Sequence, residues 1–188
     1  LLDQLEKQRI YCRPISALNE GKAQEKIEKR GDLSRFQASS PKLNVLIRNK
    51  DQISALKNFN LGVVYLDFDH GAEYKKAILE LKEKGFKAGI ATTRILKPKE
   101  YKHLRVIMGA DPDIILVRNL GALQYLNVNK AKIPTVELTG DFSLNITNRL
   151  SADYLLSKGL MGFCPAYDLN GNQLIDLIDS LQGVSFEI

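Results

Sequence analysis

The sequence predicts an α/β fold in which strand–helix units repeat to form a parallel sheet, a partial or irregular TIM-barrel-like arrangement. Short apolar runs alternate with amphipathic segments from residue 42 onward. Strands that alternate with helices are joined by right-handed crossovers, so they lie parallel. Six full units and the start of a seventh fit a curved, barrel-like sheet. A flat doubly wound sheet is the alternative.

Strands are expected where β-prone apolar runs end in polar or turn-forming residues. The first run, Leu43–Ile47, ends at Arg48 and Asn49, the second ends in the letters DFDH, and the third ends in TTR. The expected strands are residues 43–47, 62–68, 86–91, 113–117, 134–138, 160–164 and the start of a seventh at 184–188.

Helices are expected between the strands, because apolar residues recur there three and four positions apart. Gly85 ends one such segment, Pro98 suits the first turn of the next, and residues 150–158 form another. The apolar faces expected to pack on the sheet are Ile53, Leu56 and Phe59; Tyr74, Ala77, Ile78 and Leu81; Tyr101, Leu104, Ile107 and Met108; Leu120, Leu123 and Leu126; and Leu174, Leu177, Ile178 and Leu181.

Residues 1–40 do not follow the repeat. Residues 20–35 are dense in charge, and residues 38–41 read as a linker. We therefore expect a helical or linker segment at 1–40, the tail of a preceding domain, followed by a (β/α)-repeat domain at 41–188. The leading Leu indicates a fragment of a longer protein.

Composition narrows the classes of function. The net charge of +5 arises mainly in Lys- and Arg-rich helices, which favours solvated helix faces over a nucleic-acid patch. No apolar run approaches the roughly 20 residues of a membrane span. Cys12 and Cys164 are far apart with no histidine near them, which offers no complete zinc or iron–sulfur ligand set and predicts a reduced, cytoplasmic setting. The glycine-rich motifs of nucleotide-binding folds are absent from the sequence.

A binding site is expected where the carboxyl ends of the strands meet at one edge of the sheet. Arg48, Arg94 and Arg118 follow the first, third and fourth strands and could hold a phosphate, a carboxylate or a nucleic-acid backbone. The alternative is that each arginine pairs with an aspartate, such as Asp67 or Asp141. The candidate substrate-binding residues are Arg48, Arg94, Arg118, Asp141, Asn145, Asn148, Tyr167 and Asp168.

Other polar residues have simpler explanations. Asn49, Asn119 and Asn148 each precede a helix, and asparagine is a strong helix N-cap. The DFDH run could bind a metal, but a turn with a capping aspartate is favoured. Cys164 is expected to be a small buried residue, and His103 is expected to be exposed in mid-helix. With two histidines in the chain, the catalytic residues stay unknown.

Five runs, in this order, resemble the collagenase-like peptidase family, family U thirty-two: VLIRN, GIATTRILKPKE, PDIILVRNLGAL, GDFSLNITNRLSADYLL and PAYDLN. The resemblance covers residues 42–188. It implies a (β/α)-barrel-type fold and a hydrolase described as a collagenase-like protease. Some family members are linked to collagen degradation. Others support hydroxylation of RNA bases or quinone precursors with an iron–sulfur cluster held by cysteines.

In this family the strand beginning near Val184 continues into a segment with His and Cys, and this sequence ends before it. The resemblance therefore implies part of a peptidase-family protein that is not catalytic alone. It implies no cofactor in this chain and an iron–sulfur cluster in the full-length protein. Expected partners are a peptide or RNA substrate, no membrane, and a second copy of the chain paired through an exposed sheet edge.

Overall fold

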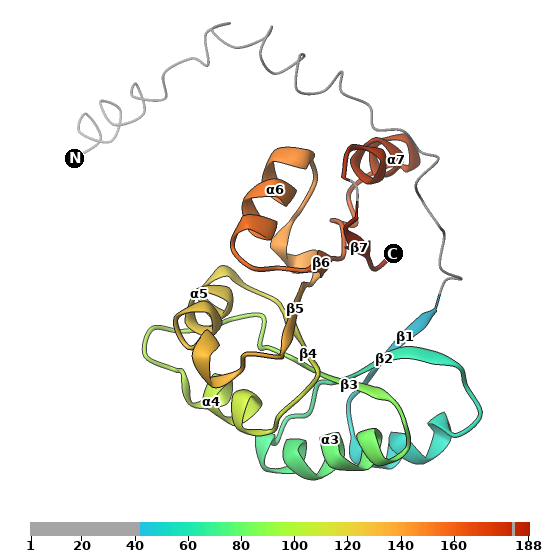
Figure 1. Ribbon diagram of the computed structural model, residues 1–188, viewed down its shortest axis with the longest axis vertical. Coiled ribbons are helices and arrows are strands. Elements are labelled where there is room, and N and C mark those ends of the chain that lie inside the picture. Colours follow the sequence, from blue (N-terminus) through green and yellow to red (C-terminus); the bar gives the residue numbers. More distant parts are fainter. Residues whose placement is uncertain (1–41, 182) are drawn as a thin grey trace, which may run out of the picture.

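A seven-stranded parallel sheet, with its strands in sequence order from β1 to β7, forms the centre of the computed structural model, which describes residues 42–181 and 183–188. The sheet curls into a half-barrel with the helices on its outer side, and the edge strands β1 and β7 face an open side (Figure 1). The α/β, partial-barrel prediction is confirmed. The doubly wound alternative is wrong, because its strand order reverses partway across the sheet. The predicted segment 1–40 lies outside the described residues.

The strands begin and end close to their predicted positions, with one clear exception. They are β1 (Leu43–Ile47), β2 (Leu61–Leu66), β3 (Lys87–Ala91), β4 (Ile114–Val117), β5 (Glu137–Gly140), β6 (Gly162–Phe163) and β7 (Ser185–Phe186). The fifth strand was predicted to begin at Pro134, but Pro134 lies in a turn. Proline has no N–H to donate to a neighbouring strand, so pairing starts only at Glu137.

The helices follow the strands as predicted, with two local differences. They are α3 (Tyr74–Glu83), α4 (Lys102–Gly109), α5 (Leu120–Val128), α6 (Arg149–Ser157) and α7 (Gly171–Ser180), with 3-10 turns η2 (Lys50–Leu56), η3 (Gly71–Glu73), η4 (Lys130–Lys132) and η5 (Phe142–Leu144). The segment after β1 is the 3-10 helix η2, and Phe59 lies beyond it, exposed. Pro98 lies outside α4, because Lys99 adopts a left-handed φ of 70° that an α-helix excludes.

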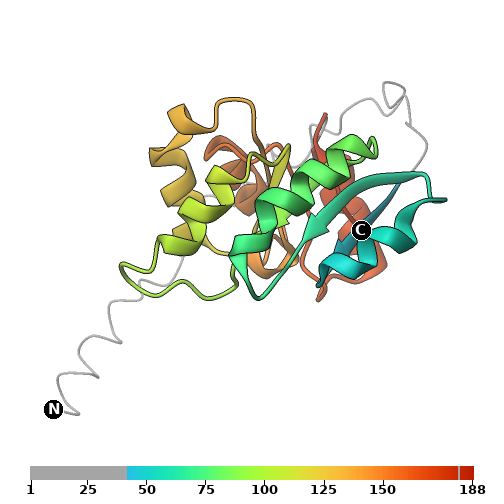
Figure 2. The ribbon, with the colours of Figure 1, turned by 90° about the horizontal axis from the view of Figure 1, so that it is seen from below.

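The larger core lies between the outer side of the sheet and the helices. Val64, Leu66 and Ile90 point outward from the strands and pack against the buried face of α3. Figure 2 views the molecule from the side of α3, which lies across the sheet. The predicted faces at Tyr74, Ala77, Ile78 and Leu81 and at Leu104 and Ile107 are buried, whereas Leu120 is exposed. All helices of the described residues are too short or too polar to cross a membrane.

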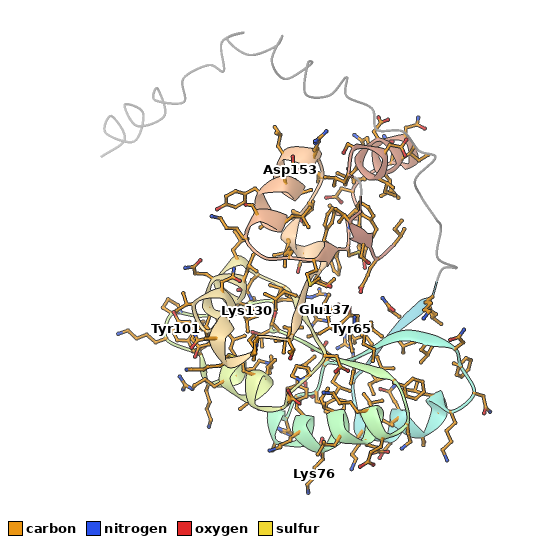
Figure 3. All side chains as sticks on the ribbon, viewed as in Figure 1. Tyr65, Lys76, Tyr101, Lys130, Glu137 and Asp153 are labelled. Carbon is orange, nitrogen blue, oxygen red and sulfur yellow. The ribbon has the colours of Figure 1, made fainter. Side chains whose placement is uncertain are left out.

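A second, smaller core occupies the concave side of the sheet. It consists of Val63, Tyr65, Ala91, Ile114 and Leu116, which alternate with the outward residues along their strands. Figure 3 shows Tyr65 and Glu137 on this side and Lys76 projecting from the outer side of α3.

The inner face also joins the two ends of the sheet. The carboxylate of Glu187, which follows β7, accepts hydrogen bonds from Asn44 Nδ2 at 2.9 Å and from Tyr65 Oη at 2.5 Å. Asn44 belongs to β1 and Tyr65 to β2. Side chains thus link β7 to β1 and β2, although β7 has no backbone pairing with either of these strands in the described part of the chain.

Candidate functional site

Alternate side chains of each strand point to the concave side of the sheet. This alternation continues just past the carboxyl ends of four strands, where it places charged side chains at the concave edge. Arg48, Asp67, Arg118 and Asp141 each come two positions after an inward residue of β1, β2, β4 or β5. Because the strands are parallel, these four residues lie at one rim of the half-barrel. We call them the rim charge network.

Arg118 is the centre of this network. Its side chain is 6% exposed, and Nη1 donates to Asp67 Oδ1 at 3.0 Å. Its Nε lies 3.9 Å from Asp141 Oδ2, which is too far for a hydrogen bond. Among the described residues, this Nε is the one buried side-chain donor or acceptor without a hydrogen-bond partner. Leaving such a donor unpaired costs about 1–3 kcal/mol, so Arg118 is held in the network at some cost to stability.

Asp141 is held from the other side by its own loop. Its Oδ2 accepts from Ser143 Oγ at 2.7 Å, and the carboxylate caps the 3-10 turn η5. Ser143 Oγ also lies 2.9 Å from the carbonyl oxygen of Arg118. These bonds fix Asp141 beside Arg118 without satisfying the Arg118 Nε.

The three candidate arginines do not converge on one point. Arg48 is 74% exposed, with Nη2 4.0 Å from Asp67 Oδ2, so Arg48 and Arg118 share one carboxylate. Arg94 is exposed and forms no ion pair with any described residue; its guanidinium carbon lies 4.8 Å from the ring centroid of Phe142. The predicted pairing with aspartate therefore describes Arg48 and Arg118, whereas Arg94 makes a cation–π contact instead.

An exposed aromatic stack lies beside the rim charge network. The rings of Phe142 and Tyr167 stack with centroids 4.0 Å apart and planes 15° apart. Tyr167 covers one face of Phe142, so Arg94 lies against the other. We call Arg94, Phe142 and Tyr167 the aromatic ladder. Tyr167 is 73% exposed, which leaves an aromatic surface open to a ligand.

Several of the remaining candidates shape loops. Asn49, Asn119 and Asn148 cap the helices that follow them, as predicted, and Asn170 caps α7 in the same way. Asn145 adopts a left-handed φ of 53°, a conformation that asparagine tolerates better than most residues.

Asp168 and most of the DFDH run make few of the contacts at the rim that the sequence predicts. Asp168 is exposed and makes no ion pair with a described residue. Asp67 joins the rim charge network, but Asp69 and His70 are exposed, and the expected aspartate cap is not formed. Within 42–181 and 183–188, no group of three or more His, Cys, Asp or Glu side chains is placed to hold a metal ion.

Cys164 is half-buried and protonated at neutral pH. Burial, with a smaller effect of the Asp141 carboxylate, raises the pKa of the thiol to about 11. A thiol with this pKa is a poor nucleophile. An iron–sulfur cluster requires several thiolates, and Cys164 is the single cysteine of the described residues, so these residues do not fit a cluster.

A cleft beside the rim was missed by sequence reasoning. Its volume is about 610 Å³, and it lies where η3, the loop after β3 and the start of α4 meet. Its lining residues are Gly71, Ala72, Thr93, Ile95, Leu96, Glu100, Lys102, His103 and Val106.

His103 was predicted to be exposed, and this prediction is wrong. Its ring packs edge-on against Tyr74 with centroids 5.9 Å apart, and burial lowers the pKa of the imidazole. The helical spacing from His103 to the buried Ile107 was the signal that could have found this.

No model of a known protein family matches this chain, and no curated protein matches it either. The resemblance to the collagenase-like peptidase family therefore stays a prediction, and the geometry of the rim has to carry any functional assignment.

Proposed function

We propose that this domain is the substrate-binding part of a (β/α)-barrel protein of the collagenase-like peptidase family, and that its rim binds an extended, proline-rich polypeptide. The observation that carries the proposal is the aromatic ladder, which presents the exposed ring of Tyr167 and the exposed guanidinium of Arg94. Grooves that bind extended proline-rich segments present exposed aromatic rings for the proline rings and donors for the peptide carbonyl groups. Tyr167 offers such a ring, and the exposed guanidinium of Arg94 offers such donors.

The charges of the rim favour a peptide over a polyanion. Asp67 and Asp141 offset the charges of Arg48 and Arg118, which leaves Arg94 as the excess cation among the three candidate arginines. A nucleic-acid backbone would meet both carboxylates and gain little net attraction. A peptide backbone carries no net charge, so the near-neutral rim does not weaken its binding.

The chain is proposed to bind substrate without cleaving it alone. Hydrolysis of a peptide bond requires an activated nucleophile or a metal-bound water. Cys164, the thiol nearest the rim by sequence, is protonated at neutral pH because its pKa is about 11. Cys164 is therefore not assigned as the nucleophile.

A second candidate function takes its support from the same aromatic ladder. An exposed tyrosine next to an arginine also stacks on RNA bases. The domain would then be an RNA-binding module, or part of an iron–sulfur-dependent hydroxylase of RNA bases or quinone precursors whose cluster ligands lie outside the described residues.

Fluorescence anisotropy with a labelled single-chain proline-rich peptide and a single-stranded RNA of similar length distinguishes these functions. We expect peptide binding that Tyr167→Ala weakens about two- to ten-fold, from the 0.5–1.5 kcal/mol of an aromatic contact. The matched control is Tyr154→Ala, because Tyr154 is also exposed and has a cation beside its ring, Lys158 Nζ at 5.2 Å, but lies on α6.

The outcomes point in different directions. Binding of the peptide by wild type and by Tyr154→Ala, with loss in Tyr167→Ala, supports the proposal. Binding of RNA alone, weakening steeply with salt, favours the second function. Equal loss in both tyrosine variants, or no binding of the peptide, overturns the proposal.

A further inference from the structure

The cleft between η3, the loop after β3 and α4 is a site separate from the aromatic ladder. Its volume of about 610 Å³ falls in the range of small-molecule pockets, about 300–1,000 Å³. Ile95, Leu96 and Val106 give it an apolar wall, and Ile95 is 80% exposed in the absence of a ligand. An exposed isoleucine at the mouth of a cleft gains burial when an apolar group enters.

Two of the polar residues that line the cleft are charged and form no ion pair within the described part of the chain. Glu100 and Lys102 both line it, yet neither forms an ion pair with the other or with any described residue. Lys102 is the first residue of α4, which begins without a side-chain cap, so the first backbone N–H groups of the helix add to the positive character of this end. The cleft thus offers one anionic and one cationic partner, Glu100 at the end of the loop and Lys102 at the start of α4.

His103 supplies a third polar group with a different character. Its ring is fixed edge-on against Tyr74, whose hydroxyl donates to the carbonyl of Phe68 at 3.1 Å. Neither imidazole nitrogen forms a hydrogen bond to a described residue. The imidazole therefore packs against Tyr74 and is free to donate or accept a hydrogen bond inside the cleft.

We propose that the cleft binds a small zwitterion with an apolar side chain, that is, a free aliphatic α-amino acid. The α-carboxylate pairs with Lys102, the α-ammonium pairs with Glu100, and the side chain packs on Ile95, Leu96 and Val106. A cleft lined by one anionic and one cationic residue is electrostatically complementary to a ligand that carries a positive and a negative group a few ångströms apart. A simple anion or a fatty acid would leave one of the two charges unmatched.

NMR titration of the full chain with L-leucine tests this proposal. The sequence has two histidines, His70 and His103, so the imidazole signal of His70 serves as an internal control. We expect leucine to shift the His103 signal and to leave the His70 signal in place. The charge-deleted analogues N-acetyl-leucine and leucinamide should each bind about two- to five-fold more weakly, as expected for the loss of one exposed ion pair.

Variants assign each charge. Lys102→Ala should weaken leucine binding by a similar factor and leave leucinamide unaffected, whereas Glu100→Gln should weaken leucine and leave N-acetyl-leucine unaffected. Lys76→Ala, on the outer side of α3, is the matched control and should change nothing (Figure 3). The proposal is overturned if leucine fails to shift His103 at tens of millimolar, if both histidines shift equally, or if the analogues bind as tightly as leucine. These measurements do not depend on whether the rim binds a peptide.

Discussion

Replacing Arg118 with methionine should lower the free energy of unfolding by about 3 kcal/mol, because it leaves two aspartates without their buried cation. The side chains of Asp67 and Asp141 are 23% and 9% exposed, so neither is well solvated. Breaking a buried ion pair by removing one partner costs about 3–5 kcal/mol. The lower end applies here, because Asp67 keeps Arg48 and because the unpaired Nε is removed with the side chain.

Arg48→Met is the matched control for this change. Arg48 contacts the same carboxylate, but it is 74% exposed and its Nη2 lies 4.0 Å from Asp67 Oδ2. An exposed pair of this kind contributes about 0–1 kcal/mol. Arg118→Lys adds a second comparison, since it keeps the charge and removes the Nε–H.

Urea denaturation followed by circular dichroism measures these differences. At about 2–4 °C per kcal/mol for a domain of this size, Arg118→Met should also lower the melting temperature by about 6–12 °C. A double-mutant cycle with Asp67→Asn should show coupling of at least about 1 kcal/mol. A loss of less than about 1 kcal/mol in Arg118→Met, or an equal loss in Arg48→Met, would refute the central role of Arg118 in the network.

Three further changes test other parts of the fold. Gly89→Ala should destabilise by about 1–3 kcal/mol in urea denaturation, because a Cβ would lie 2.5 Å from Cδ1 of Tyr65, whose hydroxyl is held by Glu187; a neutral result would contradict this packing. Burial raises the pKa of Glu187 above 4.5, so its contribution to stability is present below pH 4.5 and is lost as the pH rises through the raised pKa. Glu187→Gln should therefore flatten the pH dependence of the free energy of unfolding above about pH 4.5, and an unchanged profile would count against it. Asn148→Ala should cost about 1 kcal/mol in thermal unfolding, because it removes the capping box with Ser151, and a loss below about 0.3 kcal/mol would show that the cap is dispensable.

The sheet and its helices were predictable because they depend on local periodicity. The spacing of Tyr74, Ala77, Ile78 and Leu81 fixed the buried face of α3, and the alternation of strands with helices fixed the parallel order. The apolar run around Pro134 predicts a strand from that residue, but Pro134 has no N–H to donate, so pairing begins only at Glu137.

The site was only partly predictable, because contacts between distant loops are not encoded in local patterns. The sequence indicated Arg118 and Asp141 as rim residues and offered pairing of the arginines with Asp67 or Asp141 as an alternative, but not that Arg48 and Arg118 share the Asp67 carboxylate. The charge of Arg94 predicts an anionic partner, whereas its contact with Phe142 joins two segments that lie 48 positions apart in the sequence. Such pairings depend on the curvature of the sheet, which residue type and spacing do not specify.

The side-chain link across the open side of the half-barrel has a consequence for how the molecule opens. Strands β3 and β4 have backbone partners on both sides, whereas β6 and β7 pair over two residues each. Amide hydrogens of β3 and β4 should therefore exchange with solvent only when the whole domain unfolds, and those of β7 through smaller, frequent openings. Each such opening separates Glu187 from Asn44 and Tyr65, so fast amide exchange of β7 and loss of these two side-chain hydrogen bonds report the same opening.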